Sequence, residues 1–366
     1  MRRITRIATA GIASAALALS VTACGSDKKS DTAGDAKGGK AAIAYDIGGR
    51  GDQSFNDAAY AGLAKAEKEF GIKGTEAEPS EGEGDPDKVQ RLTSLARAGN
   101  NPVIGVGFAY APAIAEVAPK FPDTTFGLID DTSKTGKNIA NLVFNEEQGS
   151  YLAGVAAAKV TKSNTVGFIG GVETPLIKKF EAGFVQGVKD TNKNVNVKVQ
   201  YLTQPPDFGG FSKPDLGKAA AQGQIDAGAD VVYAAAGLAG SGSIEAAAKA
   251  KKWAIGVDSD QYKQSGLAAY KEYILTSVTK DVSGAVFNLI KSVQDGKPQS
   301  GEVRYGLDAN GVGLSTSNPA FTEMTEVIAA VDKAKADIAA GTIKVTRRRF
   351  DPYGNPRGTE PTTWPD

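Results

Sequence analysis

The sequence predicts an α/β protein built from two open parallel sheets. Short apolar runs alternate with segments of helical periodicity from residue 41 to residue 258. The spacing is roughly 30 residues per unit, which favours parallel strands joined by right-handed crossovers. The 366-residue chain begins with 23 residues that have the features of a secretion signal, and the 343 residues after them are enough for two α/β domains of ordinary size. The structural alternative is a single closed barrel.

The first unit begins with an apolar run at 41–45, which we expect to be a buried strand, followed by a glycine-rich turn at 46–52. A helix should follow, with Ser54 as its N-cap and Asp57 in the place of the usual Glu or Gln of a capping box. Its apolar side chains keep helical spacing until Gly71, which ends the helix.

Later units repeat this order. The Asp85-Pro86 pair begins a helix that Gly99 closes. Further strands are expected at 102–108, 124–129, 138–144, 165–169, 195–202, 231–235 and 254–257. Further helices are expected at 113–120, 147–160, 176–189, 215–227 and 243–251. This order indicates crossover connections within each sheet.

The N-terminus has the features of a bacterial lipoprotein signal. Arginines within the first six residues precede an apolar stretch at 12–20, and small residues precede Cys24, the only cysteine of the chain. We expect residues 1–23 to be removed and the Cys24 thiol to be acylated, for example by palmitate. Residues 24–40 should then form a flexible tether from the extracytoplasmic face of the cell membrane. The alternative is a secreted protein whose signal contains a cysteine by chance.

The composition excludes several function classes. The chain has 42 basic and 42 acidic residues, so it lacks the basic footprint of a nucleic-acid-binding protein. Histidine is absent and no cysteine follows Cys24, which excludes Ser-His-Asp and Cys-His catalysis and removes the best zinc and copper ligands. We therefore expect no metal site and no cofactor, whereas carboxylate or Ser-Lys chemistry stays open.

Polar and aromatic residues gather where the predicted strands end, which is where open parallel sheets bind ligands. They are Asp46, Ser54, Phe55, Asn56, Asp130, Gly237 and Asp258. Carboxylates suit sugar hydroxyls because each can accept two hydrogen bonds. Phe55 is either a stacking surface or a core residue, and the pattern alone slightly favours the core. The turn at 48–51 matches no phosphate-binding motif.

Six segments carry a family resemblance. The first reads Asp46-x-Gly48 and then Asp52-x-Ser54-Phe55-Asn56, and the others are residues 126–130, 144–154, 180–187, 255–261 and 276–280. Taken in this order across residues 41–345, they resemble the basic membrane protein family of lipoproteins. Members of this family are nucleoside-binding receptors of the purine nucleoside receptor type.

The resemblance implies a type I periplasmic-binding-protein fold, with two Rossmann-like lobes that have parallel sheets and are joined by three hinge crossovers. The N-terminal lobe would comprise residues 41–144 and 262–297, and the C-terminal lobe residues 145–261 and 298–345. A ligand would bind between the lobes and pass to an ABC transporter permease. Such a tethered receptor is expected to be a monomer.

The resemblance also implies the ligand-binding residues. Phe55 and Phe211 would sandwich the base, and Asp130 would bind its edge. The groups that would hold base or ribose from the two lobes are Asp46, Asn56, Gly237, Asp258 and Lys280. The segment 204–210 looks longer than in the family, so Phe208 could replace Phe211 as the second ring. Residues 346–366 extend beyond the family's usual end and are expected to form a disordered tail.

Three functions are compatible with these residues. The first is a receptor that captures nucleosides, with purine nucleosides favoured. The second keeps the fold but binds a sugar or a signalling ligand, because aromatic and acidic side chains suit sugars too. The third is a nucleoside or glycoside hydrolase that uses two carboxylates from among Asp46, Asp130 and Asp258. Capture alone suffices for a tethered receptor, which disfavours the third.

Overall fold

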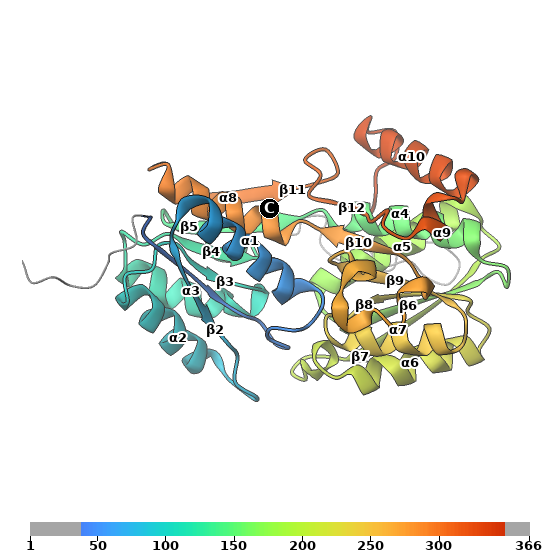
Figure 1. Cartoon of the computed structure of the whole chain (residues 1–366), viewed down its shortest axis with the longest axis horizontal. Coiled ribbons are helices and arrows are strands. Elements are labelled where there is room, and N and C mark those ends of the chain that lie inside the picture. Colours follow the sequence, from blue (N-terminus) through green and yellow to red (C-terminus); the bar gives the residue numbers. More distant parts are fainter. Residues whose placement is uncertain (1–37, 348–366) are drawn as a thin grey trace, which may run out of the picture. The chain divides into compact units, whose positions relative to one another are not determined.

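Two six-stranded sheets organise residues 38–347, the part of the chain that the computed structural model describes (Figure 1). The first sheet has the strand order β11-β5-β4-β3-β1-β2, and all its pairings are parallel. Its strands are β1 (Lys40–Ala44), β2 (Lys73–Ala77), β3 (Val103–Gly105), β4 (Phe126–Ile129), β5 (Ile139–Phe144) and β11 (Gly301–Tyr305).

The second sheet has the order β12-β10-β9-β8-β6-β7 and is parallel except for the antiparallel edge strand β12. Its strands are β6 (Thr165–Val172), β7 (Asn196–Thr203), β8 (Val231–Ala235), β9 (Trp253–Asp258), β10 (Ile274–Lys280) and β12 (Val312–Leu314). The expected fold class of two open parallel sheets is confirmed, and the barrel alternative is excluded.

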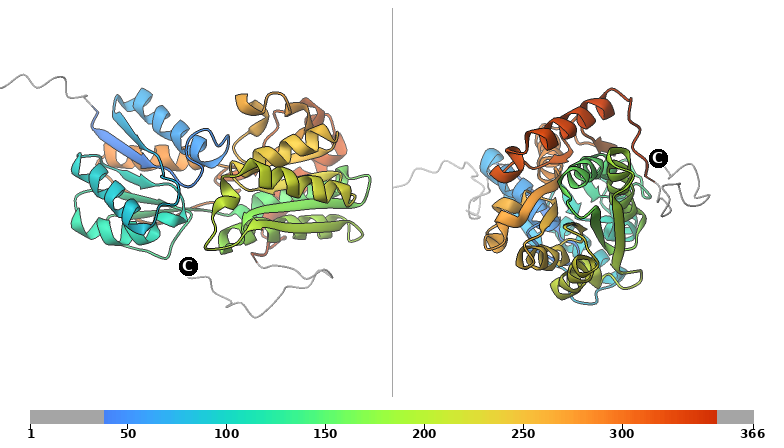
Figure 2. Two further views of the ribbon diagram at one scale, coloured as in Figure 1. Left: turned by 90° about the horizontal axis from the view of Figure 1, so that it is seen from below. Right: turned by 90° about the vertical axis from the view of Figure 1, so that its right-hand side faces the viewer.

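Helices cover both faces of each sheet (Figure 2). Beside the first sheet lie α1 (Phe55–Phe70), α2 (Asp85–Arg97), α3 (Ala111–Val117) and α8 (Val282–Gln294). With the second sheet come α4 (Glu146–Val160), α5 (Pro175–Thr191), α6 (Pro214–Asp226), α7 (Ala239–Lys249), α9 (Pro319–Thr322) and α10 (Thr325–Ala339). In the described residues, no helix combines the length and the apolar run needed to cross a bilayer.

The two faces of β1 show why its sequence forms a buried strand. Ile43 and Tyr45 pack into the core on the side of α1 and α8, whereas Ala42 and Ala44 pack into the core formed with α2 and α3. Successive side chains of a strand point to opposite faces, so a strand covered on both sides reads as a continuous apolar run. The same alternation holds in β8, where Tyr233 faces one core and Val232 the other.

The chain passes between the two sheets three times: from β5 to α4, from β10 to α8, and from β11 to β12. Two strands pair in a different sheet from the one that the expected lobe boundaries gave them. The expected N-terminal lobe included β10, which pairs in the second sheet, and the expected C-terminal lobe included β11, which pairs in the first. The sequence of neither strand specifies its sheet. The sheet follows from pairing, of β10 with β9 and of β11 with β5.

Several expectations concern residues outside those that the structure describes: the signal at 1–23, the lipidation of Cys24, most of the tether and the tail beyond Arg347. The first two residues of the expected tail do make contacts. The Thr346 backbone N–H donates to Gln186 Oε1 at 2.8 Å, and the Arg347 Nε atom lies 3.0 Å from Glu147 Oε1. The end of the described chain is therefore held against α4 and α5.

Candidate functional site

A pocket, which we call the central pocket, lies where the carboxyl ends of strands from both sheets come together. All eight residues assigned to ligand binding from the sequence line it: Asp46, Phe55, Asn56, Asp130, Phe211, Gly237, Asp258 and Lys280. They follow or end β1, β4, β8, β9 and β10, or belong to α1 and the short helix at 209–211. Six of the eight were expected from their places at strand ends, whereas Phe211 and Lys280 were assigned only through the family resemblance.

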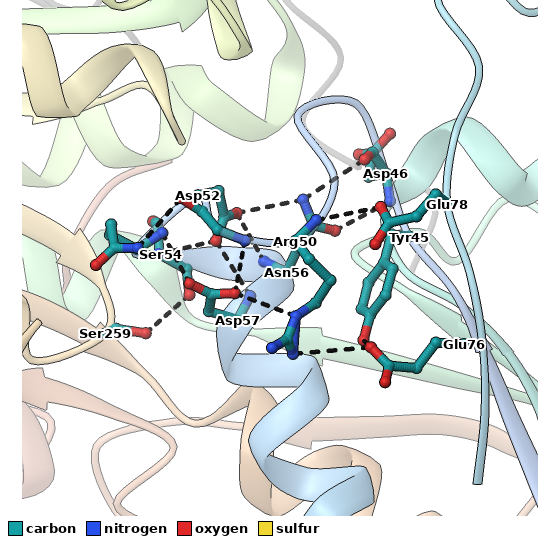
Figure 3. Close-up of polar contacts among 12 residues, drawn as sticks. Tyr45, Asp46, Arg50, Asp52, Ser54, Asn56, Asp57, Glu76, Glu78 and Ser259 are labelled. Atoms are coloured by element: carbon teal, nitrogen blue, oxygen red, sulfur yellow. Dashed lines mark hydrogen bonds and ion pairs between the residues drawn. The ribbon is translucent and has the colours of Figure 1, made fainter. Parts of the chain in front are cut away.

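The loop from β1 to α1 is shaped by glycines and by Asp52 (Figure 3). Gly48, Gly49 and Gly51 have φ values of 100°, 58° and 88°, in the left-handed region where a side chain would be strained. The buried Asp52 carboxylate accepts hydrogen bonds from the backbone N–H groups of Ser54, Asn56 and Asp57 at 2.8–3.1 Å. Asp52 thus satisfies donors that the first turn of a helix leaves free.

The expected capping role of the Ser54 side chain is wrong. Ser54 stands at the N-cap position, but its side chain makes no cap hydrogen bond. The Ser54 hydroxyl instead donates to Asp258 Oδ2 at 2.7 Å, across from the first sheet to the end of β9. Two further bonds join the same segments: Ser259 Oγ donates to the Ser54 carbonyl at 2.8 Å, and Gln261 Nε2 donates to the Gln53 carbonyl at 3.0 Å.

Arg50 holds the outer side of this loop (Figure 3). Its guanidinium carbon lies 3.4 Å from the centre of the Tyr60 ring. Its nitrogens lie 3.4 Å from Asp57 Oδ1 and 3.8 Å from Glu76 Oε2. On the inner side, Asn56 Oδ1 accepts from the Asp46 backbone N–H at 3.0 Å. These contacts hold the loop against β2 and α1.

A buried cation stands among carboxylates at the end of β10. The Lys280 ammonium lies 2.5 Å from Asp130 Oδ2 and 3.6 Å from Glu146 Oε1, and the side chains of Lys280 and Asp130 are each 3% exposed. The same ammonium lies 4.8 Å from the centre of the Phe55 ring. The other oxygen, Asp130 Oδ1, is buried and accepts no hydrogen bond from residues 38–347. Because unpaired buried acceptors are costly, this atom calls for an N–H or O–H donor from a ligand.

Two of the strand-end aspartates have strained backbones. Asp130 has φ of 69° and Asp258 has φ of 62°. Left-handed backbone is uncommon for residues other than glycine and is found disproportionately at functional sites. This conformation turns the chain at the ends of β4 and β9, beside the pocket that both residues line.

Burial shifts the protonation of these carboxyl groups. Burial raises the pKa of Asp46 to about 7, although a hydrogen bond from the Ile47 N–H opposes the change. Burial also raises the pKa of Asp130 to about 6 against the opposing charge of Lys280, and it raises the pKa of Asp258. Burial would lower the pKa of Lys280, but Asp130, Glu146 and Asp258 outweigh it and the pKa is raised. Groups with perturbed pKa values in a cleft are typical of binding sites.

The two phenylalanines offered as the second stacking ring line different pockets. Phe211 lines the central pocket, whereas Phe208 lines a neighbouring one. Gly171 makes room for the Phe211 ring, because a Cβ atom there would lie 2.5 Å from Phe211 Cδ1. Two lining rings, Phe108 and Phe180, were not assigned from the sequence. Phe180 begins one of the six segments with family resemblance, and Phe108 ends a predicted strand, so a signal existed for each.

Replacing Asp52 with alanine should lower the free energy of unfolding by about 1–2 kcal/mol, because the first turn of α1 loses its acceptor. Urea denaturation of the variant would measure the loss. Asp57→Ala is the matched control, since Asp57 accepts from the Gly51 and Gln53 N–H groups within the more exposed part of the loop. An Asp52 variant as stable as the unmodified protein would contradict this role.

The family model described as Bmp, ABC transporter substrate-binding protein PnrA-like, matches residues 40–346. The chain belongs to the Bmp family. A relative from Lactococcus lactis, the "ABC transporter nucleoside-binding protein BmpA", is 36% identical over 358 residues, which cover 93% of this chain and 98% of the relative. An uncharacterised lipoprotein from Pyrococcus horikoshii is 35% identical, with 75% of this chain and 68% of the relative covered.

A solved structure supports the same fold for this Bmp-family chain. The solute-binding protein of an ABC transporter system from Aeropyrum pernix superposes with a TM-score of 0.73 at 26% identity, covering 83% of this chain and 92% of that one. The resemblance inferred from the sequence and the periplasmic-binding-protein fold are therefore confirmed. The Bmp-family chain is a substrate-binding protein of an ABC transporter and not an enzyme, so the hydrolase alternative is set aside.

Proposed function

We propose that this Bmp-family chain captures nucleosides, and purine nucleosides in particular, in the central pocket and delivers them to an ABC permease. The observation that carries the proposal is the Asp130 Oδ1 atom, which has no hydrogen-bond partner within the described part of the chain and belongs to a pocket that Phe55 and Phe211 also line. A nucleobase offers a flat face for the rings and an N–H edge for the carboxylate. The name of the Lactococcus relative, a nucleoside-binding protein, supports the same ligand class.

The ribose has its own set of partners in this proposal. Asp46, Asn56 and Asp258 line the pocket from the ends of β1 and β9 and the start of α1. Carboxylates and an amide are suited to vicinal hydroxyls, and a site that hydrogen-bonds a hydroxyl discriminates strongly against ligands that lack it. These groups come from both sheets. A ligand that contacts all of them therefore stabilises the conformation in which the pocket residues of the two sheets lie close together.

We further propose that the protein is held at the extracytoplasmic face of the cell membrane through a lipid on Cys24. The support is the sequence around this single cysteine and the naming of the Pyrococcus relative as a lipoprotein. One acyl chain gives only marginal membrane binding, whereas two or three on the same cysteine anchor a protein stably. The anchor keeps the receptor close to its permease.

Purine nucleosides should raise the thermal stability of the protein, whereas ribose and galactose should not. A ligand at 100 times its Kd stabilises the folded state by about 2.7 kcal/mol, a shift of several degrees. The measurement is a thermal-shift panel on the chain from residue 25 onward, after unfolding and refolding to remove any bound ligand. A shift with a free sugar and none with any nucleoside would contradict the proposal.

Two phenylalanine variants sharpen this test. Phe211→Ala should weaken nucleoside binding by about 5-fold to 150-fold, because stacking on an aromatic ring contributes about 1–3 kcal/mol per base. Phe208→Ala is the matched control, since that ring lies outside the central pocket. Equal losses in the two variants would argue against a base lying on Phe211.

A further inference from the structure

A second pocket, which we call the side pocket, adjoins the central pocket and shares Phe108, Asp130 and Leu176 with it. It has a volume of about 400 Å³, against about 60 Å³ for the central pocket. The side pocket therefore adds room beside the residues that line the central pocket. Asp130 stands at the junction of the two.

One part of the side pocket is apolar. Phe108, Val143, Leu176, Pro205 and Phe208 contribute to its lining. The rings of Phe108 and Phe208 lie 6.1 Å apart between centroids and are tilted by 52°. Phe108 follows β3 of the first sheet and Phe208 follows β7 of the second, so this apolar lining comes from both sheets. Such a surface favours an apolar group.

The charged part of the side pocket does not form an anion site. Lys179 lies 3.4 Å from Glu146 and Arg347 lies 3.0 Å from Glu147. Arg304 lies 2.6 Å from Glu302. Each lining cation is thus already paired with a carboxylate, while Asp130 and Asp131 add negative charge to the lining. A phosphate group would meet carboxylates there, so the chemistry favours an uncharged substituent over a nucleotide.

We propose that this receptor accepts purine nucleosides that carry an apolar substituent on the exocyclic amino group, with the substituent lying in the side pocket. The proposal rests on the nucleoside function proposed above. A monosubstituted amino group keeps one N–H, which can donate to Asp130 Oδ1, the buried oxygen that has no partner among the residues that the structure describes. Its second substituent then lies beside Asp130, where Leu176 and Phe108 lead from one pocket into the other.

Isothermal titration with matched ligands tests the proposal. The first set is adenosine, N6-benzyladenosine and N6,N6-dimethyladenosine, and the second set is guanosine and N2-benzylguanosine. For the parent that binds, the benzyl derivative should bind within about fivefold, since the side pocket has room for it. The dimethyl derivative, which has no N–H left, should bind at least about tenfold more weakly than adenosine.

The outcomes separate the two proposals. If neither parent nucleoside binds, the proposed function itself fails. If a parent binds and its benzyl derivative is about 100-fold weaker or worse, the proposed function stands and the substituent proposal is overturned. A benzyl derivative that binds as well as its parent supports both.

A variant of Val143 shows where the substituent lies. Val143 is 4% exposed, lines the side pocket and does not line the central pocket. Val143→Trp should weaken binding of the benzyl derivative by about tenfold or more and change that of the parent by less than about threefold. Val143→Ala, the matched control, should leave both affinities nearly unchanged. A Trp variant that weakens both ligands equally, or neither, would overturn the placement.

Discussion

Replacing Lys280 with methionine should lower the free energy of unfolding at pH 7.5 by about 3–5 kcal/mol, because removing one partner leaves buried charges uncompensated. The Lys280 ammonium contacts Asp130 and Glu146, and its charge also acts on Asp258. Methionine keeps most of the side-chain volume, so the loss reports on charge and not on a cavity. Thermal or urea unfolding of the ligand-free protein would measure it.

The Lys280 effect should depend on pH with a defined sign. The pKa of Asp130 is raised to about 6 with Lys280 in place, and it should rise further in the variant. Protonation then removes the uncompensated charge, so the deficit should be smaller at pH 5 than at pH 7.5. Lys179→Met is the control: Lys179 contacts Glu146 at 3.4 Å and is more exposed than Lys280. We expect the Lys179→Met substitution to lower the free energy of unfolding by about 1 kcal/mol. An equal loss in both variants would contradict the role given to Lys280.

The position of the site could be predicted from the sequence for a general physical reason. Parallel strands present their carboxyl ends at one edge, so residues that follow different strands become neighbours without being close in sequence. Asp46 and Asp130 are an example, since they follow β1 and β4 of the first sheet and line one pocket. Asp258 ends β9 of the second sheet and lines the same pocket. Lys280 has no such local signal and entered only through the family resemblance.

The details that could not be predicted depend on contacts between residues that are far apart in the sequence. Ser54 and Asp52 can both accept from the N-terminal turn of α1, and the sequence pattern favours Ser54. The structure uses Asp52 because the Ser54 hydroxyl has a partner in Asp258, which lies 204 residues away. Likewise, the assignment of β10 and β11 to their sheets follows from pairing with β9 and β5 and not from their own composition.

The choice between Phe208 and Phe211 has the same origin. Both rings occur within one glycine-rich segment, and composition does not distinguish them. The helical turn at 209–211 directs Phe211 to the space beside Gly171, while Phe208 packs near Phe108. Backbone geometry over four residues therefore decides which ring lines the central pocket.

Replacing Asp46 with asparagine should make the ligand-free protein more stable at pH 8 and no more stable at pH 4. Burial raises the pKa of Asp46 from 3.8 to about 7, so the folded state binds this proton more tightly than the unfolded state. The contribution of Asp46 to stability is therefore intact below pH 3.8 and falls as the pH rises to about 7. Asparagine keeps an oxygen that can accept from the Ile47 N–H, which now bonds to Asp46 at 2.8 Å.

The size of the gain follows from the same shift. Each tenfold change in proton affinity corresponds to about 1.4 kcal/mol, which sets an upper value of about 4 kcal/mol. The residue is partly exposed, and solvent reduces the effect, so we expect between about 2 and 4 kcal/mol. Thermal unfolding of both proteins from pH 4 to pH 8 measures it. Equal stability at pH 8 would contradict the argument.

The same substitution should weaken nucleoside binding, which separates the two roles of Asp46. In the proposed function this carboxylate accepts hydrogen bonds from the ligand, and an asparagine side chain has fewer acceptor positions to offer. A variant that is more stable without ligand and binds more weakly would show that the Asp46 charge is retained for recognition at the expense of stability. Weaker binding without the gain at pH 8 would instead assign Asp46 to recognition alone.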